Sequence, residues 1–97
     1  MATGAQMVTD GGGDSTEQAL RALLAETLGL APERVAAFDD QTLLFGALPE
    51  FDSLAVANFL TAFEERFGVL IEDDDVEAED FASFGSLLAF TRRVTSK

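Results

Sequence analysis

The 97-residue chain carries 18 acidic and 6 basic residues, a formal net charge of −12, and it contains neither His nor Cys. The negative charge excludes nucleic acid as a partner, because phosphate backbones are bound by Lys and Arg, and it argues equally against an anionic membrane surface. Without His and Cys the chain cannot build zinc-type sites, thiol catalysis, Ser–His–Asp triads or disulfides. Apolar residues nevertheless make up 47% of the chain, enough for the core of one small domain.

Residues 1–14 contain four of the eight Gly and no large apolar cluster, which predicts a flexible N-terminal tail ahead of a domain at residues 15–97. No apolar run reaches the length of a membrane span, so membrane insertion is not expected. The first seven residues lack the basic and apolar regions of a signal peptide, and we therefore expect a cytoplasmic protein.

The first helix is predicted at residues 15–28, where Ser15 can cap the start, Gln18 can close a capping box and Gly29 can end the helix. A long connection follows at residues 30–51. It carries more apolar residues than a solvated loop needs, so we expect it to lie across the core with short turns. These residues are Val35, Phe38, Leu43, Leu44, Phe45 and Leu48.

A second helix is predicted at residues 53–67, with Asp52 as its N-cap and Gly68 as its end. Helical periodicity separates its residues into two faces. The predicted core face comprises Val56, Phe59, Leu60, Phe63 and Phe67. The opposite face comprises Leu54, Asn58, Thr61 and Glu65. Leu54 is therefore a large aliphatic side chain that points away from the core.

Residues 72–80 contain seven acids in nine positions, and Val76 and Phe81 are the apolar anchors that allow one or two short helical turns there. A calcium loop starting at Asp73 would need Gly at its sixth position and Glu at its twelfth, where the sequence has Ala78 and Phe84. We therefore predict no metal site and interpret the run as a solvated acidic surface.

The last helix is predicted from a Ser83 cap to about Val94, with Arg92 and Arg93 in its final turn, where cations favour the helix dipole. It should bury Phe84, Leu87, Leu88, Phe90 and Val94. The resulting fold class is all-α: a small bundle of three main helices plus one short helix, with a long loop between the first two helices.

One motif stands out from this background. The stretch at residues 48–56, L-P-E-F-D-S-L-A-V, opens the second helix with D-S-L, and that helix closes with E-E-R-F-G. In this context the chain resembles the acyl carrier protein family from about residue 16 to residue 94. The same stretch looks most like the carriers that are linked to exosortase and exopolysaccharide gene systems.

The resemblance implies that Ser53 carries a covalent 4′-phosphopantetheine donated by coenzyme A, on which an acyl group is held as a thioester. It further implies that Asp52 helps a modifying phosphopantetheinyl transferase to hold a metal ion. The other implied partners are acyl-loading enzymes and acyl-transfer or condensing enzymes, and the chain is expected to be a non-catalytic monomer. The residues agree with this role, since Ser53 falls at the first helical position, where backbone N–H groups and the helix dipole favour an anion.

The expected partner face combines an exposed aliphatic side chain with nearby polar and acidic ones. It comprises Leu54, Asn58, Thr61, Glu64, Glu65, Asp73, Asp74 and Asp75. Many fatty-acid carriers have further acids early on this helix, where this chain has Ala55 and Asn58. That departure favours a dedicated pathway with its own partner enzymes. Two alternatives remain open, an aminoacyl or peptidyl carrier and an acidic interaction module without a prosthetic group.

Overall fold

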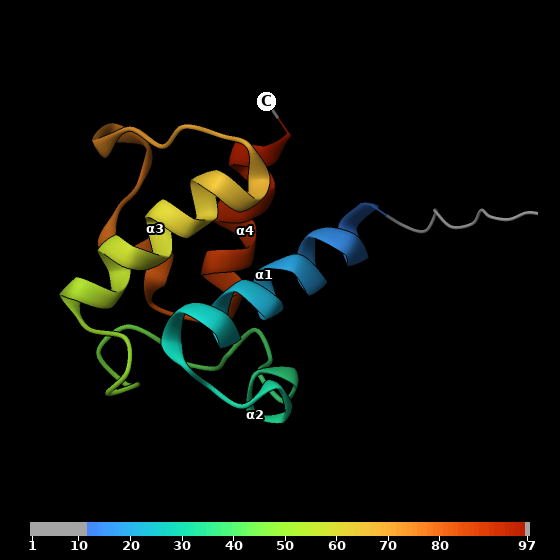
Figure 1. Cartoon of the computed structure of the whole chain (residues 1–97), viewed down its shortest axis with the longest axis vertical. Helices are drawn as coiled ribbons and strands as arrows, with labels where there is room; N and C mark the ends of the chain where they lie inside the picture. The colour runs from blue at the N-terminus through green and yellow to red at the C-terminus, as the bar shows by residue number, and fades with distance from the viewer. Residues whose placement is uncertain (1–11, 97) are drawn as a thin grey trace, which may run out of the picture.

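The computed structural model describes residues 12–96, apart from the side chains of residues 12–14 and 73. Three main helices form the domain: α1 (Gly12–Leu28), α3 (Ser53–Phe67) and α4 (Phe84–Thr95). A short helix α2 (Pro32–Ala36) interrupts the first long loop, and two 3-10 turns, η2 (Asp73–Asp75) and η3 (Ala78–Phe81), lie between α3 and α4. Helix α1 contacts α3 and α4, and α2 lies just beyond the C-terminal end of α1, which it also contacts (Figure 1). The predicted all-α class is confirmed.

The predicted ends of α3 and α4 are confirmed by their caps. Asp52 precedes α3 in an extended conformation and its Oδ1 accepts a hydrogen bond from the Ala55 N–H at 2.9 Å. Gly68 ends the same helix with φ 66°, a left-handed conformation that glycine adopts without strain. Ser83 caps α4, where its Oγ accepts a hydrogen bond from the Ser86 N–H at 3.2 Å.

The predicted start of the first helix is wrong. Helix α1 already includes Gly12, so Ser15 is an exposed residue within the helix and does not cap it. Each residue added to a helix contributes one further backbone hydrogen bond. Helix α1 therefore extends beyond Ser15, because serine is compatible both with a cap position and with the first turn of a helix. Residues 1–11 of the predicted tail lie outside the described residues.

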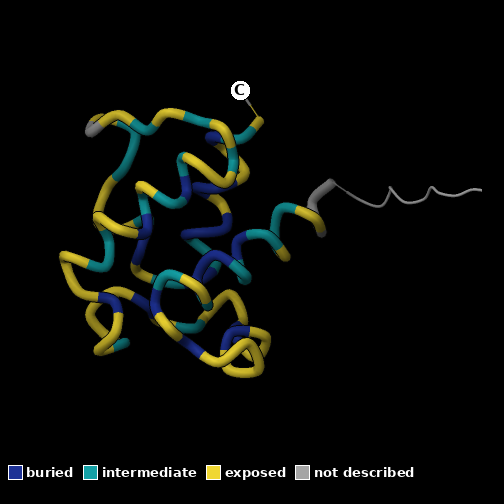
Figure 2. Tube along the Cα trace, in the orientation of Figure 1, coloured by how far each residue is buried: buried dark blue, intermediate teal, exposed yellow. Residues whose placement is uncertain are grey.

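Phenylalanine rings from α3, α4 and the connecting segments form the centre of the core. Phe63 contacts the ring of Phe90 at a centroid distance of 5.8 Å, and Phe51 contacts Phe81 edge to face at 5.8 Å. Phe59 contacts both Phe51 and Phe81 in the same geometry. Such tilted and edge-on contacts are the favoured arrangements for aromatic pairs. Figure 2 shows the buried residues gathered where α1, α3 and α4 face one another.

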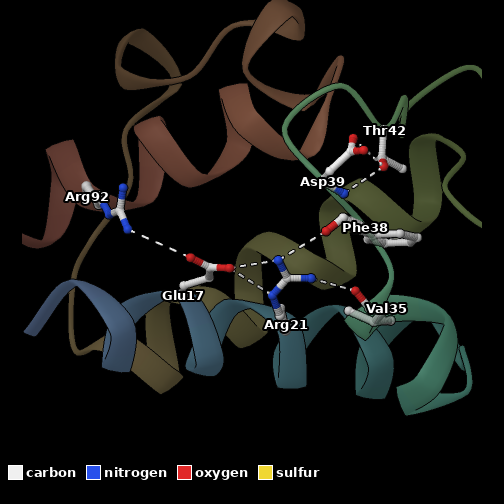
Figure 3. A network of polar contacts seen from close by, with 7 residues as sticks. All are labelled: Glu17, Arg21, Val35, Phe38, Asp39, Thr42 and Arg92. Atoms are coloured by element: carbon white, nitrogen blue, oxygen red, sulfur yellow. Dashed lines mark hydrogen bonds and ion pairs between the residues drawn. The ribbon is translucent and has the colours of Figure 1, made fainter. Parts of the chain in front are cut away.

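The loop at residues 30–51 is tied to α1 by one half-buried side chain. The guanidinium of Arg21 donates to the Val35 carbonyl at 2.7 Å and to the Phe38 carbonyl at 3.1 Å (Figure 3). Glu17 holds the same guanidinium from one helical turn away, at 2.7 Å, and the Arg21 Cζ lies 4.4 Å from the centre of the Phe84 ring. Arg21 therefore fixes the path of the chain around α2.

The second half of the loop is tied to the segment before α4 by backbone hydrogen bonds. The N–H groups of Leu44 and Phe45 donate to the carbonyls of Ala82 and Phe81, each at 2.9 Å. This pairing buries Leu44 completely and leaves Leu43 62% exposed and Phe45 40% exposed. The apolar residues predicted to cover the core thus divide between core and surface. In the part of the chain that the structure describes, no helix is long and apolar enough to cross a membrane.

Candidate functional site

Ser53 is the first residue of α3 and is exposed, as the sequence predicts. Its neighbour Asp52 is also exposed, and the carboxylate of Asp52 is engaged with the Ala55 N–H inside the first turn. The cap fixes the direction in which the chain enters the helix. The Ser53 hydroxyl is consequently presented on a rigid helix start, close to the positive end of the helix dipole.

An apolar groove of about 260 Å³ lies beside Ser53. One wall belongs to α3 and another to the segment at residues 76–81, which descends beside the start of α3 in Figure 1. We call it the Ser53 groove. Its lining comprises Ser53, Phe45, Val56, Leu60, Val76, Glu77, Ala78 and Phe81. A mainly apolar lining with few polar groups is typical of a site for an apolar ligand.

The groove explains why the predicted core face of α3 is only partly buried. Phe59 and Phe63 are completely buried in the core, whereas Val56 and Leu60 are half-buried and line the groove. The apolar face of α3 therefore lies partly in the protein core and partly along the Ser53 groove. Helical periodicity identifies that face but cannot distinguish a residue packed against protein from one facing a groove.

A second hollow, of about 400 Å³, is also lined by Ser53. It is formed by the turn at residues 46–49 together with Phe45, Phe51 and Asp52, and we call it the turn hollow. In the same turn, the Glu50 carboxylate accepts a hydrogen bond from Arg34 at 3.0 Å. A backbone hydrogen bond to the Glu50 carboxylate, followed by the one from Arg34, lowers the pKa of Glu50 below its ordinary value, so this carboxylate is anionic at neutral pH.

The predicted partner-face residues do not all have free side chains. Leu54 is 71% exposed, and Asn58, Thr61 and Glu65 are exposed on the same face of α3. Glu64 is half-buried, however, and its Oε2 accepts a hydrogen bond from the Ile71 N–H at 2.7 Å. Glu64 therefore stabilises the turn after α3.

The acidic residues of η2 are also partly engaged. Asp74 is exposed, while Asp75 is half-buried and its Oδ2 accepts a hydrogen bond from the Glu72 N–H at 3.1 Å. Nothing is described of the Asp73 side chain. Among the side chains that the structure describes, no group of His, Cys, Asp or Glu could hold a metal ion.

Apart from Ser53, sequence reasoning did not identify the residues that line the groove as part of a site. Phe45 and Val76 were expected to lie across the core or to anchor it, and Ala78 was not singled out. The signal available in the sequence was the surplus of apolar residues before and after α3. Which of them face the groove depends on the pairing of residues 44–45 with residues 81–82.

Comparison with known proteins identifies the family of this chain. The family model described as "Phosphopantetheine attachment site" matches residues 18–91. An acyl carrier protein of Zymomonas mobilis is 40% identical over 65 residues, which cover 64% of this chain and 74% of that protein. The chain belongs to the acyl carrier protein family. The solution structure of a holo acyl carrier protein from Nitrosomonas europaea has a TM-score of 0.74 and 37% identity, covering 84% of this chain and 96% of that one.

An acyl carrier protein takes a covalent 4′-phosphopantetheine, and the described residues fit such a group. An exposed hydroxyl on the first turn of α3 is open to modification, and the turn is suited to a phosphodiester because helix starts favour anions. The adjoining groove offers apolar surface to whatever the group carries. The site thus combines a polar attachment point, the Ser53 hydroxyl, with the apolar Ser53 groove beside it.

Proposed function

We propose that Ser53 is the attachment residue of this acyl carrier protein. The observation that carries the proposal is the position of an exposed hydroxyl at the start of α3, directly beside an apolar groove. The Ser53 oxygen forms a phosphodiester with the phosphopantetheine part of coenzyme A. The pyrophosphate bond of coenzyme A breaks, adenosine 3′,5′-bisphosphate leaves, and the hydroxyl proton passes to solvent.

The attached group supplies a thiol that holds an acyl chain as a thioester. The residues of the protein have supporting roles in this function. Asp52 holds the helix start through the Ala55 N–H and, by family resemblance, helps the transferase to bind its metal ion. The groove walls, including Val56 and Leu60, shelter an apolar chain from water. The domain is a carrier without catalysis of its own, and it raises the local concentration of its cargo at partner enzymes.

The proposed partners are a phosphopantetheinyl transferase, acyl-loading enzymes, and acyl-transfer or condensing enzymes. They would meet the exposed face of α3, where Leu54 stands out and Asn58 and Thr61 add no charge. No acidic residue lies in the first turn of α3. The absence of acidic residues from the first turn of α3 supports a dedicated pathway, for which the sequence resemblance points to exopolysaccharide-linked carriers, rather than general fatty-acid synthesis.

The test is intact mass spectrometry after incubation with coenzyme A and a broad-specificity phosphopantetheinyl transferase. We expect the mass of one phosphopantetheine to be added and Ser53→Ala to abolish the addition. Ser15→Ala, at an exposed serine of α1, is the matched control and should be modified like the unchanged protein. Modification of folded Ser53→Ala, or an unchanged mass of the natural sequence with several transferases, would refute the assignment.

A further inference from the structure

Two hollows, not one, adjoin Ser53, and the same aromatic side chain lines both. Phe45 is a wall of the Ser53 groove and also a wall of the turn hollow. Of the described residues that line the groove, Phe45 alone comes from the chain that precedes Ser53. Phe45 and Ser53 are therefore the two residues that the linings of the groove and the turn hollow share.

The position of this ring is set by the backbone around it. The Phe45 N–H donates to the Phe81 carbonyl at 2.9 Å, next to the Leu44 N–H that donates to Ala82. The ring contacts Phe51 edge to face at a centroid distance of 6.2 Å. Gly46 follows with φ 89°, which lets the chain turn away immediately after the ring.

Phe45 is 40% exposed although it is one of the larger apolar residues, so burial in the core does not account for its position. The ring is supported by the buried Phe51, and Phe45 belongs to the lining of both hollows. A ring held in this way is placed to act as a partition between the groove, of about 260 Å³, and the turn hollow.

We propose that Phe45 separates the Ser53 groove from the turn hollow and thereby determines the length of acyl chain that this carrier shelters, an inference that rests on the proposed attachment at Ser53. A closed apolar cavity of about 150 Å³ accepts benzene, so the Ser53 groove, with about 260 Å³ but open to solvent, takes at most about ten carbons. Longer chains extend beyond the groove into water. The carrier thus matches aliphatic chains of medium length.

The expected effect follows from the cost of exposing apolar groups. Each methylene that enters the groove shifts the sheltered population by up to about fourfold, whereas methylenes beyond the partition add little. Replacing Phe45 by Ala removes a phenyl ring and joins the groove to the turn hollow. The removed ring has the size of benzene, so the sheltered length should increase by up to about six carbons.

The experiment uses the full-length protein loaded by a transferase with straight-chain acyl-coenzyme A of four to sixteen carbons. Two properties are measured for each chain length, the rate of thioester cleavage by hydroxylamine and the melting temperature. For the natural sequence we expect slower cleavage and a higher melting temperature up to about ten carbons, followed by a plateau. In Phe45→Ala the plateau should begin at longer chains, and in Phe45→Leu at an intermediate length.

Leu43→Ala is the matched control, because Leu43 is exposed, lies two residues away and lines neither hollow. It should leave the plateau where it is. Circular dichroism checks each variant, and Phe45→Leu carries the test if Phe45→Ala is not folded. An identical plateau in natural, Phe45→Leu and Phe45→Ala proteins, or an equal shift in Leu43→Ala, overturns the inference while the attachment at Ser53 stands. Failure to load the natural protein at all contradicts the proposed function itself and the inference with it.

Discussion

Replacing Arg21 by Met tests whether a single side chain holds the loop at residues 30–51 in place. Methionine keeps an unbranched apolar stem but removes the donors that satisfy the carbonyls of Val35 and Phe38, at 2.7 and 3.1 Å (Figure 3). It also removes the cation from the face of the Phe84 ring, 4.4 Å away. The variant therefore removes both hydrogen bonds by which α1 holds the loop through Arg21. The Val35 carbonyl keeps the hydrogen bond from the Phe38 N–H at 3.0 Å.

The magnitude follows from these contacts. A hydrogen bond from a charged donor contributes about 1.5–3 kcal/mol, and a cation over an aromatic face adds about 0.5–1 kcal/mol. The Arg21 side chain is 22% exposed, so water can replace part of what is lost. We expect the free energy of unfolding to fall by about 2–4 kcal/mol, a large part of the roughly 5–15 kcal/mol that stabilises a domain of this kind.

Urea denaturation followed by circular dichroism measures this loss. With a slope of about 1–3 kcal/mol per molar urea, the unfolding midpoint should fall by roughly 0.7–4 M. Arg34→Met is the matched control, because the Arg34–Glu50 pair is 3.0 Å long but exposed on both sides. Exposed pairs contribute about 0–1 kcal/mol, so this midpoint should change little. Equal midpoints for the two variants would show that Arg21 does not fix the loop.

Two further substitutions test the assignment of faces and the packing of α4. Leu54→Ala should change the free energy of unfolding by less than about 0.5 kcal/mol but slow phosphopantetheine transfer, because Leu54 is 71% exposed beside Ser53. Phe63→Ala, at a fully buried ring, should cost about 3–5 kcal/mol in the same denaturation assay, and equal losses for the two would contradict the helical phase of α3. Gly85→Ala should destabilise by about 1–3 kcal/mol, because the added Cβ would lie 2.8 Å from the Asp40 carbonyl oxygen. A helix ordinarily gains from Gly→Ala, so a stabilised variant in a thermal melt would refute the close approach of α4 to the loop.

The sequence determined those features that depend on residues close together in the chain. Asp52 and Gly68 mark the ends of α3 because a side-chain cap and a left-handed glycine satisfy the helix ends locally. The phase of α3 follows from periodicity, and so do the burial of Phe63 and the exposure of Leu54. The position of Ser53 in the first turn could also be predicted from the residues next to it in the chain. The start of α1 was the local feature that failed, since Ser15 is compatible both with a cap and with a first turn.

Only the tertiary structure decided how the long loop is divided between core and site. Leu44 is buried while Phe45 remains at the surface, because backbone pairing with residues 81–82 sets which side chains turn inward. Glu64 resembles a free surface acid in the sequence, yet it is held by the Ile71 N–H seven residues away. The Ser53 groove requires α3 and residues 76–81 to come together. Contacts between distant segments depend on how those segments pack. The spacing of residues along the chain predicts local structure but does not predict which distant segments pack together.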